Sequence, residues 1–307
     1  MSLTNQLIAN VERVVVGKRE VIELAVVALL CRGHVLLEDV PGTGKTMLAR
    51  ALARSVAADM KRIQCTPDLL PSDITGVSIY SQKTTEFEFR PGPVFTDLLL
   101  ADEINRATPR AQSALLECME EFHVTYDGTT YPLPALFMVL ATQNPIDMAG
   151  THPLPEAQLD RFFVRLSVGY PSVSEEVSIL DAQAKQHPID SLAPVANVAD
   201  ILAARDAVRS VHVAASVTEY VVRICDATRR HHELSLGASP RAALALARGA
   251  RGLAYLRGNA FVTPDLVKRM AAPILEHRLM LKPKAAAVGR TASAILGEIL
   301  AQVRPPV

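Results

Sequence analysis

The stretch "EDVPGTGKTMLAR" at residues 38–50 decides the fold that this sequence predicts. It contains the Gly-Lys-Thr triplet that ends a phosphate-binding loop, whose full pattern is G-x-x-x-x-G-K-[ST]. Asp39 stands where that pattern has its first glycine. The stretch follows a short apolar run and precedes a helix-forming segment, which is the context that such a loop requires. The sequence therefore predicts a phosphate-binding site in which one motif position is changed.

The two remaining glycines lie where phosphate oxygens would approach the backbone most closely. Backbone N–H groups in a Gly-rich turn and at a helix N-terminus form a concave positive site. The lysine of the pattern contacts the β- and γ-phosphates, and the hydroxyl that follows it binds Mg²⁺. We expect Asp39 to point away from the nucleotide, because it lies at the strand end, before the phosphates are reached. The expected nucleotide-binding residues of the loop are Gly42, Thr43, Gly44, Lys45, Thr46 and Met47, with Thr46 also a metal ligand.

Strand-like and helix-like segments alternate through the first half of the chain. Strands separated by helices predict a parallel sheet with crossover helices. Residues 76–95 and 122–134 interrupt this order and are typical of antiparallel hairpins, and the second contains the turn-forming pair Asp127-Gly128. The predicted strands lie within residues 34–39, 61–66, 97–103, 135–145 and 162–171.

The pattern changes after residue 171. The segment at 172–186 predicts a helix that is capped by Ser174 and carries Glu175 and Glu176 in its first turn. Helical periodicity continues, and no strand-like run appears after about residue 215. We therefore predict an α/β fold, in which a P-loop NTPase αβα core with a parallel sheet and a linker helix occupies residues 1–190. A smaller all-α lid domain is expected to occupy residues 191–307.

The composition excludes several classes of protein. The 32 basic and 32 acidic residues balance, which argues against dominant contacts to nucleic-acid phosphates, although a local basic patch fits this balance. The four cysteines lack C-x-x-C spacing and predict reduced, buried thiols. The N-terminus lacks the features of a signal peptide, and the most apolar window is too short for a membrane span. We expect a cytoplasmic protein.

A second motif, "DLLLADEINRA" at residues 97–107, supplies carboxylates. The apolar strand ends in Asp102-Glu103, and ligands of α/β sheets bind at the carboxyl ends of strands. We expect Asp102 to contact the nucleotide's Mg²⁺, and Glu103 to orient and deprotonate the attacking water. An isolated acidic pair is more often a solvated strand end. The preceding phosphate-binding loop and the long apolar strand favour the functional interpretation.

Taken in order, "PGTGKT", "LLLADEINRA" and "ATQNP" resemble the motifs of AAA+ ATPases. The stretches "EDVPGTGKT", "LPEAQLDRFFVRLSVGYP" and "GASPRA" are similar to the MoxR family within that group, for which Asp39 is the expected residue. The resemblance covers nearly the whole chain. It implies Mg²⁺-dependent ATP hydrolysis by a homo-oligomeric ring, a hexamer, with a chaperone role toward a protein client. It also implies a von Willebrand A-domain partner, and it gives no reason to expect nucleic acid.

The resemblance assigns roles to residues outside the two motifs. Asn144 matches sensor 1, which positions the attacking water, and an ordinary turn residue is the alternative. Arg161 matches the arginine finger that enters the neighbouring subunit's site. Arg165 is a weaker candidate for that role, and a structural ion pair is the alternative for both arginines. Arg241 matches sensor 2, which would reach the γ-phosphate of its own subunit.

Val16 and Gly17 match the segment that lines the adenine in this family. The two hairpins match inserts that project toward the pore of such rings. Phe87, Phe89 and Arg90 are therefore candidates for client contact, with local hairpin packing as the alternative. Two other functions stay open, a DNA-acting AAA+ motor and a non-hydrolysing nucleotide switch or scaffold. The zero net charge disfavours the first, and the complete set of expected catalytic residues disfavours the second.

Overall fold

The computed structural model describes residues 2–145, 150–184 and 187–306. Its centre is a five-stranded parallel sheet with the strand order β2-β5-β8-β1-β9, so the five predicted strands are confirmed. The central strands β1, β5 and β8 are buried almost throughout, as strands covered on both faces require. The strands are β1 (Val35–Glu38), β2 (Met60–Gln64), β5 (Leu98–Asp102), β8 (Met138–Gln143) and β9 (Val164–Leu166).

Helices cover the sheet. The helix predicted to follow the phosphate-binding loop is present and begins directly after Gly44. That helix, α3, starts at Lys45, and Leu48 and Leu52 are fully buried on one of its faces. It packs against α1, which in turn packs against α2. The helices of the first half are α1 (Leu3–Glu12), α2 (Arg19–Leu30), α3 (Lys45–Ser55), α4 (Pro71–Thr75), the 3₁₀ turn Ile104–Arg106, α5 (Pro109–Glu121), α6 (Glu156–Leu159) and α7 (Val173–Gln183).

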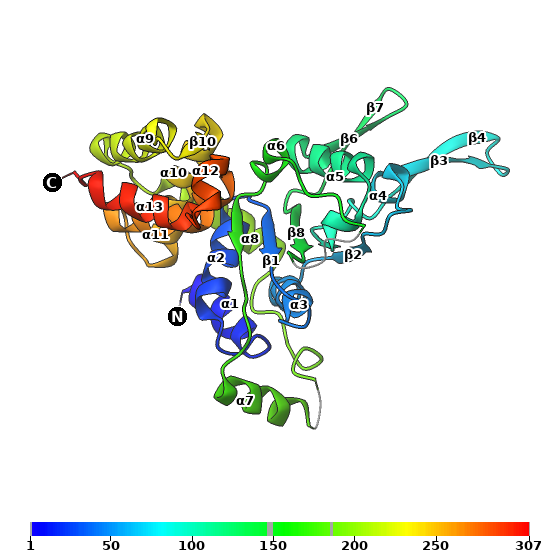
Figure 1. Cartoon of the computed structure of the whole chain (residues 1–307). Coiled ribbons are helices and arrows are strands. Elements are labelled where there is room, and N and C mark those ends of the chain that lie inside the picture. Colours follow the sequence, from blue (N-terminus) through cyan, green and yellow to red (C-terminus); the bar gives the residue numbers. More distant parts are fainter. Residues whose placement is uncertain (1, 146–149, 185–186, 307) are drawn as a thin grey trace.

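Both predicted hairpins are confirmed. The first pairs β3 (Gly76–Ser81) with β4 (Glu86–Pro91), and the second pairs β6 (His123–Tyr126) with β7 (Thr129–Pro132). Asp127 and Gly128 both have positive φ, 49° and 74°, as expected for a tight two-residue hairpin turn. Both hairpins project from the side of the molecule opposite to helices α9–α13 (Figure 1).

The two hairpins also contact each other. Of the two phenylalanines predicted to contact a client, one lies in this contact and the other is exposed. Phe89 stacks on Tyr131 with ring centroids 4.3 Å apart and lies 5.5 Å from the ring of Tyr126. Phe87 is instead 73% exposed and contacts only Tyr80 among the aromatic rings of the described residues. Phe89 is therefore a packing residue between hairpins, and Phe87 is the exposed aromatic side chain of the first hairpin.

The second half is helical, with one departure from the predicted all-α lid. Leu234–Leu236 (β10) and Met280–Leu281 (β11) form a short antiparallel pair. Segments of three and two residues are too short to give the alternating pattern that identifies strands in a sequence. The helices are α8 (Val198–Ser210), α9 (Ala215–Arg230), α10 (Pro240–Leu256), α11 (Pro264–Leu275), the 3₁₀ turn Glu276–Arg278, α12 (Pro283–Ala287) and α13 (Ala292–Gln302).

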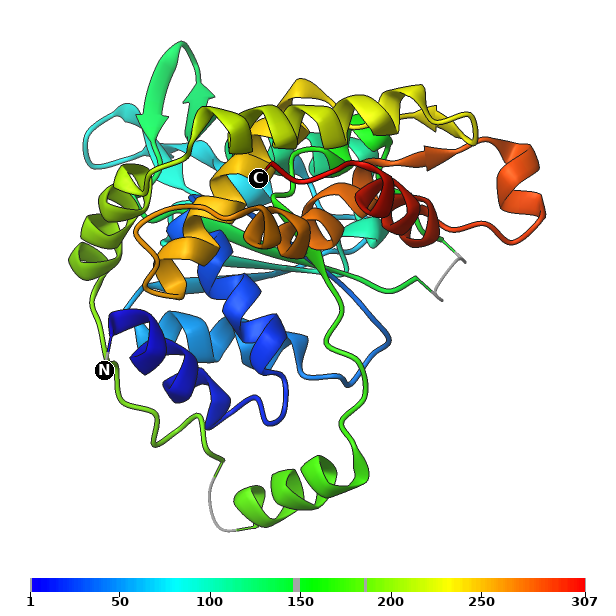
Figure 2. The ribbon, with the colours of Figure 1, turned by 90° about the vertical axis from the view of Figure 1, so that its left-hand side faces the viewer.

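The linker helix α7 is present, but its predicted cap is wrong. The N-cap is Ser172, whose hydroxyl accepts a hydrogen bond from the backbone N–H of Glu175, while the Glu175 carboxylate accepts from the N–H of Ser172. This reciprocal arrangement satisfies two backbone donors, which Ser174 inside the first turn cannot do. Residues 185–186 of the predicted helix lie outside the described residues. Helix α7 lies at the edge of the molecule, below α1 in both views (Figures 1 and 2).

The largest apolar cluster runs through both halves of the chain. It includes Leu7 and Val26 of the first helices together with Leu246 and Ile274 of the lid. Helix α10 lies directly on α2, since a side chain added at Gly252 would meet Cys31 and Val27. The domain boundary at residues 190 and 191 therefore stays a prediction.

Buried side chains confirm the expected state of the cysteines. All four are free and buried, and burial raises the pKa of the Cys31, Cys65 and Cys118 thiols to about 12. These thiols are therefore protonated at neutral pH and poorly reactive. None of the helices in the described ranges combines the length and the apolar character needed to cross a membrane.

Candidate active site

The loop between β1 and α3 has the backbone of a phosphate-binding site. Gly42 and Gly44 take left-handed φ angles of 84° and 88°, which other residues adopt at a cost. No atom lies within 4 Å of the position that a side chain would occupy at either glycine. The glycines therefore serve the backbone conformation and leave space for a ligand. Gly44 is also the N-cap of α3, so the helix N-terminus adds its partial positive charge to this space.

Lys45 is the first residue of α3, and its side chain reaches back to the segment that follows β1. Its Nζ donates hydrogen bonds to the carbonyl oxygens of Asp39 (2.5 Å) and Val40 (3.0 Å). Burial lowers the pKa of Lys45, while the charges of Asp39, Asp102 and Glu103 act to raise it. The ammonium group is thus partly desolvated, which strengthens its attraction to an anion such as a phosphate oxygen.

The carboxylate of Asp39 points away from the loop glycines, as expected. One oxygen accepts from the N–H of Val40 (2.8 Å), and the other accepts from the hydroxyl of Ser167 (3.2 Å) and the N–H of Gly169 (2.5 Å). Asp39 therefore joins the end of β1 to the segment that leaves β9. The changed motif position has a structural role, and its negative charge is stabilised by three hydrogen-bond donors.

Asp102 and Glu103 lie beside the loop, and a buried threonine fixes both. The hydroxyl of Thr142 donates to Asp102 Oδ1 (2.6 Å) and accepts from the N–H of Glu103 (2.8 Å). The second oxygen of Asp102 pairs with Arg62 at 2.6 Å. Glu103 takes a left-handed φ of 57°, which turns its side chain out of the strand direction.

The Glu103 carboxylate has two partners of its own. It accepts hydrogen bonds from Gln64 Nε2 (3.3 Å) and from Arg106 (3.1 Å). These donors come from the end of β2 and from the turn after β5, so the carboxylate is positioned by two neighbouring elements. These two hydrogen bonds restrict the carboxylate to one orientation.

Two adjoining recesses meet at the loop. The polar recess has a volume of about 350 Å³ and is lined by Pro41, Gly42, Gly44, Lys45, Thr46, Asp102, Glu103, Thr142 and Asn144. The apolar recess has a volume of about 200 Å³ and is lined by Val14, Val15, Val16, Lys18, Gly42, Thr43, Gly44, Met47, Pro171 and Ile179. The shared glycines connect them. The polar recess offers the hydroxyl and carboxylate oxygens that Mg²⁺ prefers, and the apolar recess suits a nucleobase.

Arg161 and Arg241 lie together, but at the other end of the strands. They line a recess that also contains Gly33, His34 and Phe163, which precede β1 and β9, whereas the phosphate-binding loop follows β1. Four strand residues separate these two ends by roughly 13 Å. In this structure Arg241 therefore lies away from the phosphate-binding loop of its own chain, and its role at a γ-phosphate stays a prediction.

Both arginines bind one carboxylate that the sequence did not indicate. Arg161 Nε lies 3.0 Å from Glu120 Oε2, and Arg241 pairs with the other oxygen of Glu120. We name this group the arginine pair. Arg165, the weaker finger candidate, instead pairs with Glu38 at 3.0 Å across β1 and β9.

The position of Arg241 follows from how helix α10 begins. Its N-cap, Ser239, donates to the Asp160 carboxylate (3.1 Å), and Asp160 also pairs with the buried Arg278 at 2.6 Å. These contacts hold the start of α10 beside the segment that leads into β9. Arg241 thus takes its place from contacts between residues that are distant in the sequence.

Comparison with known proteins agrees with this geometry. A family model described as "ATPase family associated with various cellular activities (AAA)" matches residues 34–164, and an AAA lid model matches residues 226–299. The chain is 42% identical to "Chaperone MoxR1" of Mycobacterium tuberculosis, over 97% of this chain and 81% of that protein. It is 34% identical to "Protein MoxR" of Paracoccus denitrificans, over 90% of this chain and 88% of that protein.

The chain belongs to the MoxR family of AAA+ ATPases. It is also 52% identical to the YeaC protein of Bacillus subtilis, over 99% of this chain and 95% of that protein. A crystal structure of a protein from Cytophaga hutchinsonii superposes with a TM-score of 0.92 at 38% identity, covering 99% of this chain and 96% of that one. The αβα core followed by a lid is thus the AAA+ arrangement, and ATP hydrolysis is the activity of this MoxR-family protein.

The apolar recess of the MoxR-family chain includes residues that sequence reasoning missed. Val16 and Met47, whose nucleotide contact stays a prediction, line it together with Pro171 and Ile179, which close it from the linker helix side. Lys18 Nζ donates to the carbonyl of Tyr170 (2.8 Å), which holds that segment in place. The sequence does not predict that Ile179 lines this recess, because no pattern in it indicates that α7 lies beside the loop.

Gly17 has a packing role in the same region. Its φ is 74°, and a side chain added there would overlap the Glu175 carboxylate. We expect Gly17→Ala to disturb the α7 capping box and to weaken ATP binding by about tenfold, since strain and displacement together cost on the order of 1–2 kcal/mol. A titration with a fluorescent ATP analogue measures this. Gly297→Ala, where a side chain would meet open space, is the matched control, and an equal loss there would contradict the packing role of Gly17.

Substitution of Asp39 tests whether this carboxylate stabilises the fold of the MoxR-family chain without contacting the nucleotide. Asp39→Ala removes the acceptor of three hydrogen bonds and should lower the free energy of unfolding by about 2 kcal/mol, measured by urea denaturation. ATP affinity should change by less than about threefold, because the carboxylate does not face the phosphates. Asp39→Gly restores the usual motif. Markedly tighter ATP binding by that variant would show that Asp39 repels the nucleotide.

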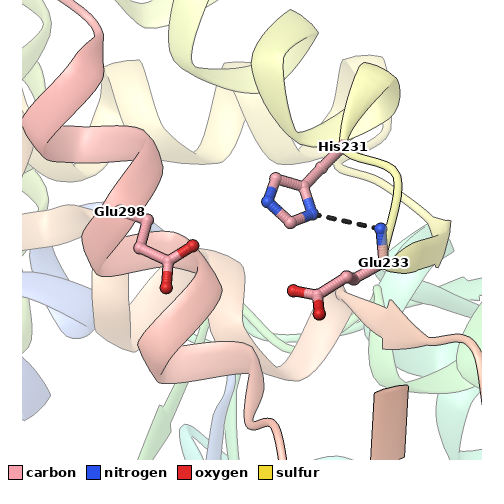
Figure 3. Close-up of side chains that lie close together, drawn as sticks. All are labelled: His231, Glu233 and Glu298. Atoms are coloured by element: carbon pink, nitrogen blue, oxygen red, sulfur yellow. Dashed lines mark hydrogen bonds between the residues drawn. The ribbon is translucent and has the colours of Figure 1, made fainter. Parts of the chain in front are cut away.

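One side-chain cluster outside the ATP site resembles a metal centre only in its residue types. His231, Glu233 and Glu298 bring ligand atoms within 4.8 Å of one another (Figure 3). Arg290 pairs with both carboxylates, each at 2.8 Å. The guanidinium group therefore already supplies the positive charge that a metal would bring.

Proposed function

We propose that this chain is a Mg²⁺-dependent ATPase that works as a homo-oligomeric ring, a hexamer, and remodels a protein client. The observation that carries the proposal is the division of the expected catalytic groups. The polar recess holds the loop and the carboxylates, whereas the arginine pair lies beyond the opposite ends of the strands. A single subunit therefore has two incomplete halves of one site. Head-to-tail contacts in a closed ring bring such halves together.

In this proposal each part of the site has one task. Backbone N–H groups of Gly42–Thr46 and the Lys45 ammonium bind the phosphates, and the apolar recess binds the base. Thr46 and Asp102 hold Mg²⁺, which neutralises phosphate charge when it is bound. Glu103 accepts the proton of the attacking water, and Asn144 orients that water.

The arginine pair completes the neighbouring subunit's site. Arg161 and Arg241 would leave Glu120 and contact the γ-phosphate of the adjacent chain, where a guanidinium stabilises transition-state charge. Because Glu120 binds both in this structure, the two arginines would be released from it together. Lid position and hydrolysis are then coupled across the subunit interface, since Arg241 belongs to the lid and Arg161 to the core.

The ring is tested by the dependence of turnover on protein concentration. ATPase activity per subunit should rise in parallel with association, as followed by sedimentation velocity over the same concentrations. A constant activity per subunit while the oligomer dissociates would contradict a site that is shared between subunits. Addition of DNA should leave turnover unchanged, whereas salt-sensitive stimulation by DNA would favour a DNA-acting motor.

The client is proposed to meet the exposed hairpin. Phe87 and Tyr80 present an aromatic pair, with 73% and 50% exposure, on a hairpin that projects from the core. Exposed aromatic side chains are typical of protein-binding surfaces. We extend to this chain the family's chaperone role and its von Willebrand A-domain partner. Capture of a client by the ATP-bound ring should fall with Phe87→Ala while basal ATP turnover persists.

Thr142 offers a further test of the site. Thr142→Val keeps the shape of the side chain but removes the bond to Asp102 and the acceptor for the Glu103 N–H. We expect turnover to fall by about tenfold to 100-fold, because both carboxylates lose their support. Thr142→Ser retains the hydroxyl and should keep most of the activity. Equal activity of the Val and Ser variants would contradict the positioning role of this hydroxyl.

A further inference from the structure

A recess separate from the ATP site lies where helices α2, α8 and α10 pack together. Its volume is about 300 Å³, and no carboxylate is among its lining residues. Five of the lining side chains are arginines, namely Arg32, Arg205, Arg209, Arg248 and Arg251. We name it the five-arginine recess. In a chain of zero net charge, this is a concentrated local excess of positive charge.

The positive charges in this recess are poorly compensated. Arg209 pairs with Asp206 at 3.1 Å, but both side chains are more than 70% exposed, where such a pair contributes little. For Arg248 and Arg251 we find no ion pair within the parts of the chain that the structure describes. The Nε atom of Arg251 is buried and has no hydrogen-bond partner. The charges of Arg248 and Arg251 are therefore not balanced by a neighbouring carboxylate among the described residues.

The fold holds these like charges together. Arg205 is buried and donates to the backbone carbonyls of Leu29 (3.0 Å) and Ala135 (2.8 Å). Burial lowers the pKa of Arg205 to about 10, and the nearby Arg32 charge acts in the same direction. Arg32 has a left-handed φ of 52° and lies 3.8 Å from the centre of the Phe122 ring. Backbone and aromatic contacts thus hold the guanidinium groups close despite their mutual repulsion.

We propose that the five-arginine recess binds a small multivalent oxyanion of the pyrophosphate or phosphate-ester class. Guanidinium groups present paired N–H donors that match phosphate oxygens, and several of them around one recess favour more than one negative charge. The other lining residues are apolar apart from Cys31, so they offer no competing carboxylate. None of the residues lines the polar or the apolar recess of the ATP site, which makes this a second site.

The recess also adjoins the arginine pair. Arg32, Phe122 and Arg248 line both the five-arginine recess and the one that contains Arg161 and Arg241. Variants at Arg32 or Arg248 would therefore affect two places at once. Arg251 and Arg209 line only the five-arginine recess, so they are the residues for a clean test.

The probe is pyrophosphate. The protein is the full-length chain with Lys45→Ala, a substitution that suppresses pyrophosphate binding at the phosphate-binding loop. Calorimetric titration at constant ionic strength should show one pyrophosphate per chain, and pyrophosphate should raise the melting temperature. Arg251→Gln in the same background should weaken binding by about tenfold or more, because a charge-assisted contact is lost. Its melting temperature without pyrophosphate should be unchanged or higher, since one repelling charge is gone.

Arg230→Gln is the matched control, because Arg230 is an exposed arginine outside the recess, and it should retain wild-type pyrophosphate affinity. Arg209→Gln gives the same test if the Arg251 variant fails to fold. Pyrophosphate affinity unchanged by both recess variants would overturn the proposal. Absence of pyrophosphate binding, together with altered subunit association in Arg251→Gln, would also overturn it, because the recess would then accept carboxylates of a neighbouring chain.

Discussion

Glu103→Gln is expected to bind ATP with nearly unchanged affinity and to hydrolyse it at least about 100-fold more slowly. The amide keeps the size of the side chain and an oxygen that can accept from Gln64 and Arg106, which hold the carboxylate now. It cannot take the proton of the attacking water. The loop glycines, Lys45 and the apolar recess are unaffected, so the loss should fall on turnover rather than on binding.

Phosphate release under steady-state conditions and titration with a fluorescent ATP analogue measure the two effects separately. Glu117→Gln, an exposed glutamate on α5 outside the polar recess, is the matched control and should behave as the wild type. Unchanged turnover in Glu103→Gln would remove Glu103 from the role of general base. Loss of ATP binding together with turnover would instead mean that the variant has disturbed the recess.

The parts of this fold that the sequence predicts are those that local patterns determine. The loop at Gly42–Thr46 carries its own backbone requirements, and buried parallel strands appear as short apolar runs. The Asp127-Gly128 turn likewise needs only two residues with positive φ. The sequence could also have indicated Thr142, because it precedes Asn144 by two positions and side chains two residues apart in an extended chain point the same way.

The parts that the sequence did not predict depend on contacts between distant segments. The place of Arg241 is set by Ser239 and Arg278 meeting at Asp160, and no spacing in the sequence indicates that junction. Assigning Arg241 to its own subunit assumed a lid orientation that the residues themselves do not specify. Ser172 differs, because its three-residue spacing from Glu175 is a capping-box pattern that the sequence did contain.

Arg161→Ala is expected to reduce turnover by about 10³-fold while the chain stays folded. Glu120 keeps its ion pair with Arg241 in this variant, so no carboxylate is left without a partner. Arg165→Ala provides the contrast. Arg165 pairs with Glu38 between β1 and β9, so its loss should affect stability more than turnover, with less than about a tenfold decrease in rate.

Mixing subunits distinguishes action on the neighbour from action within one chain. The Arg161→Ala chain has an intact Glu103, and the Glu103→Gln chain has an intact Arg161. If the arginine pair completes the neighbouring site, an equal mixture of the two nearly inactive variants forms functional sites at about one quarter of its interfaces. Phosphate release should therefore recover to about a quarter of the wild-type rate after subunit exchange. No recovery, despite exchange demonstrated with labelled subunits, would place Arg161 and Glu103 in the same chain's site.

The same mixture made with Arg241→Ala tests the lid residue independently. Recovery with both arginine variants is expected, because one Glu120 carboxylate holds both guanidinium groups on the face of the chain away from its own loop.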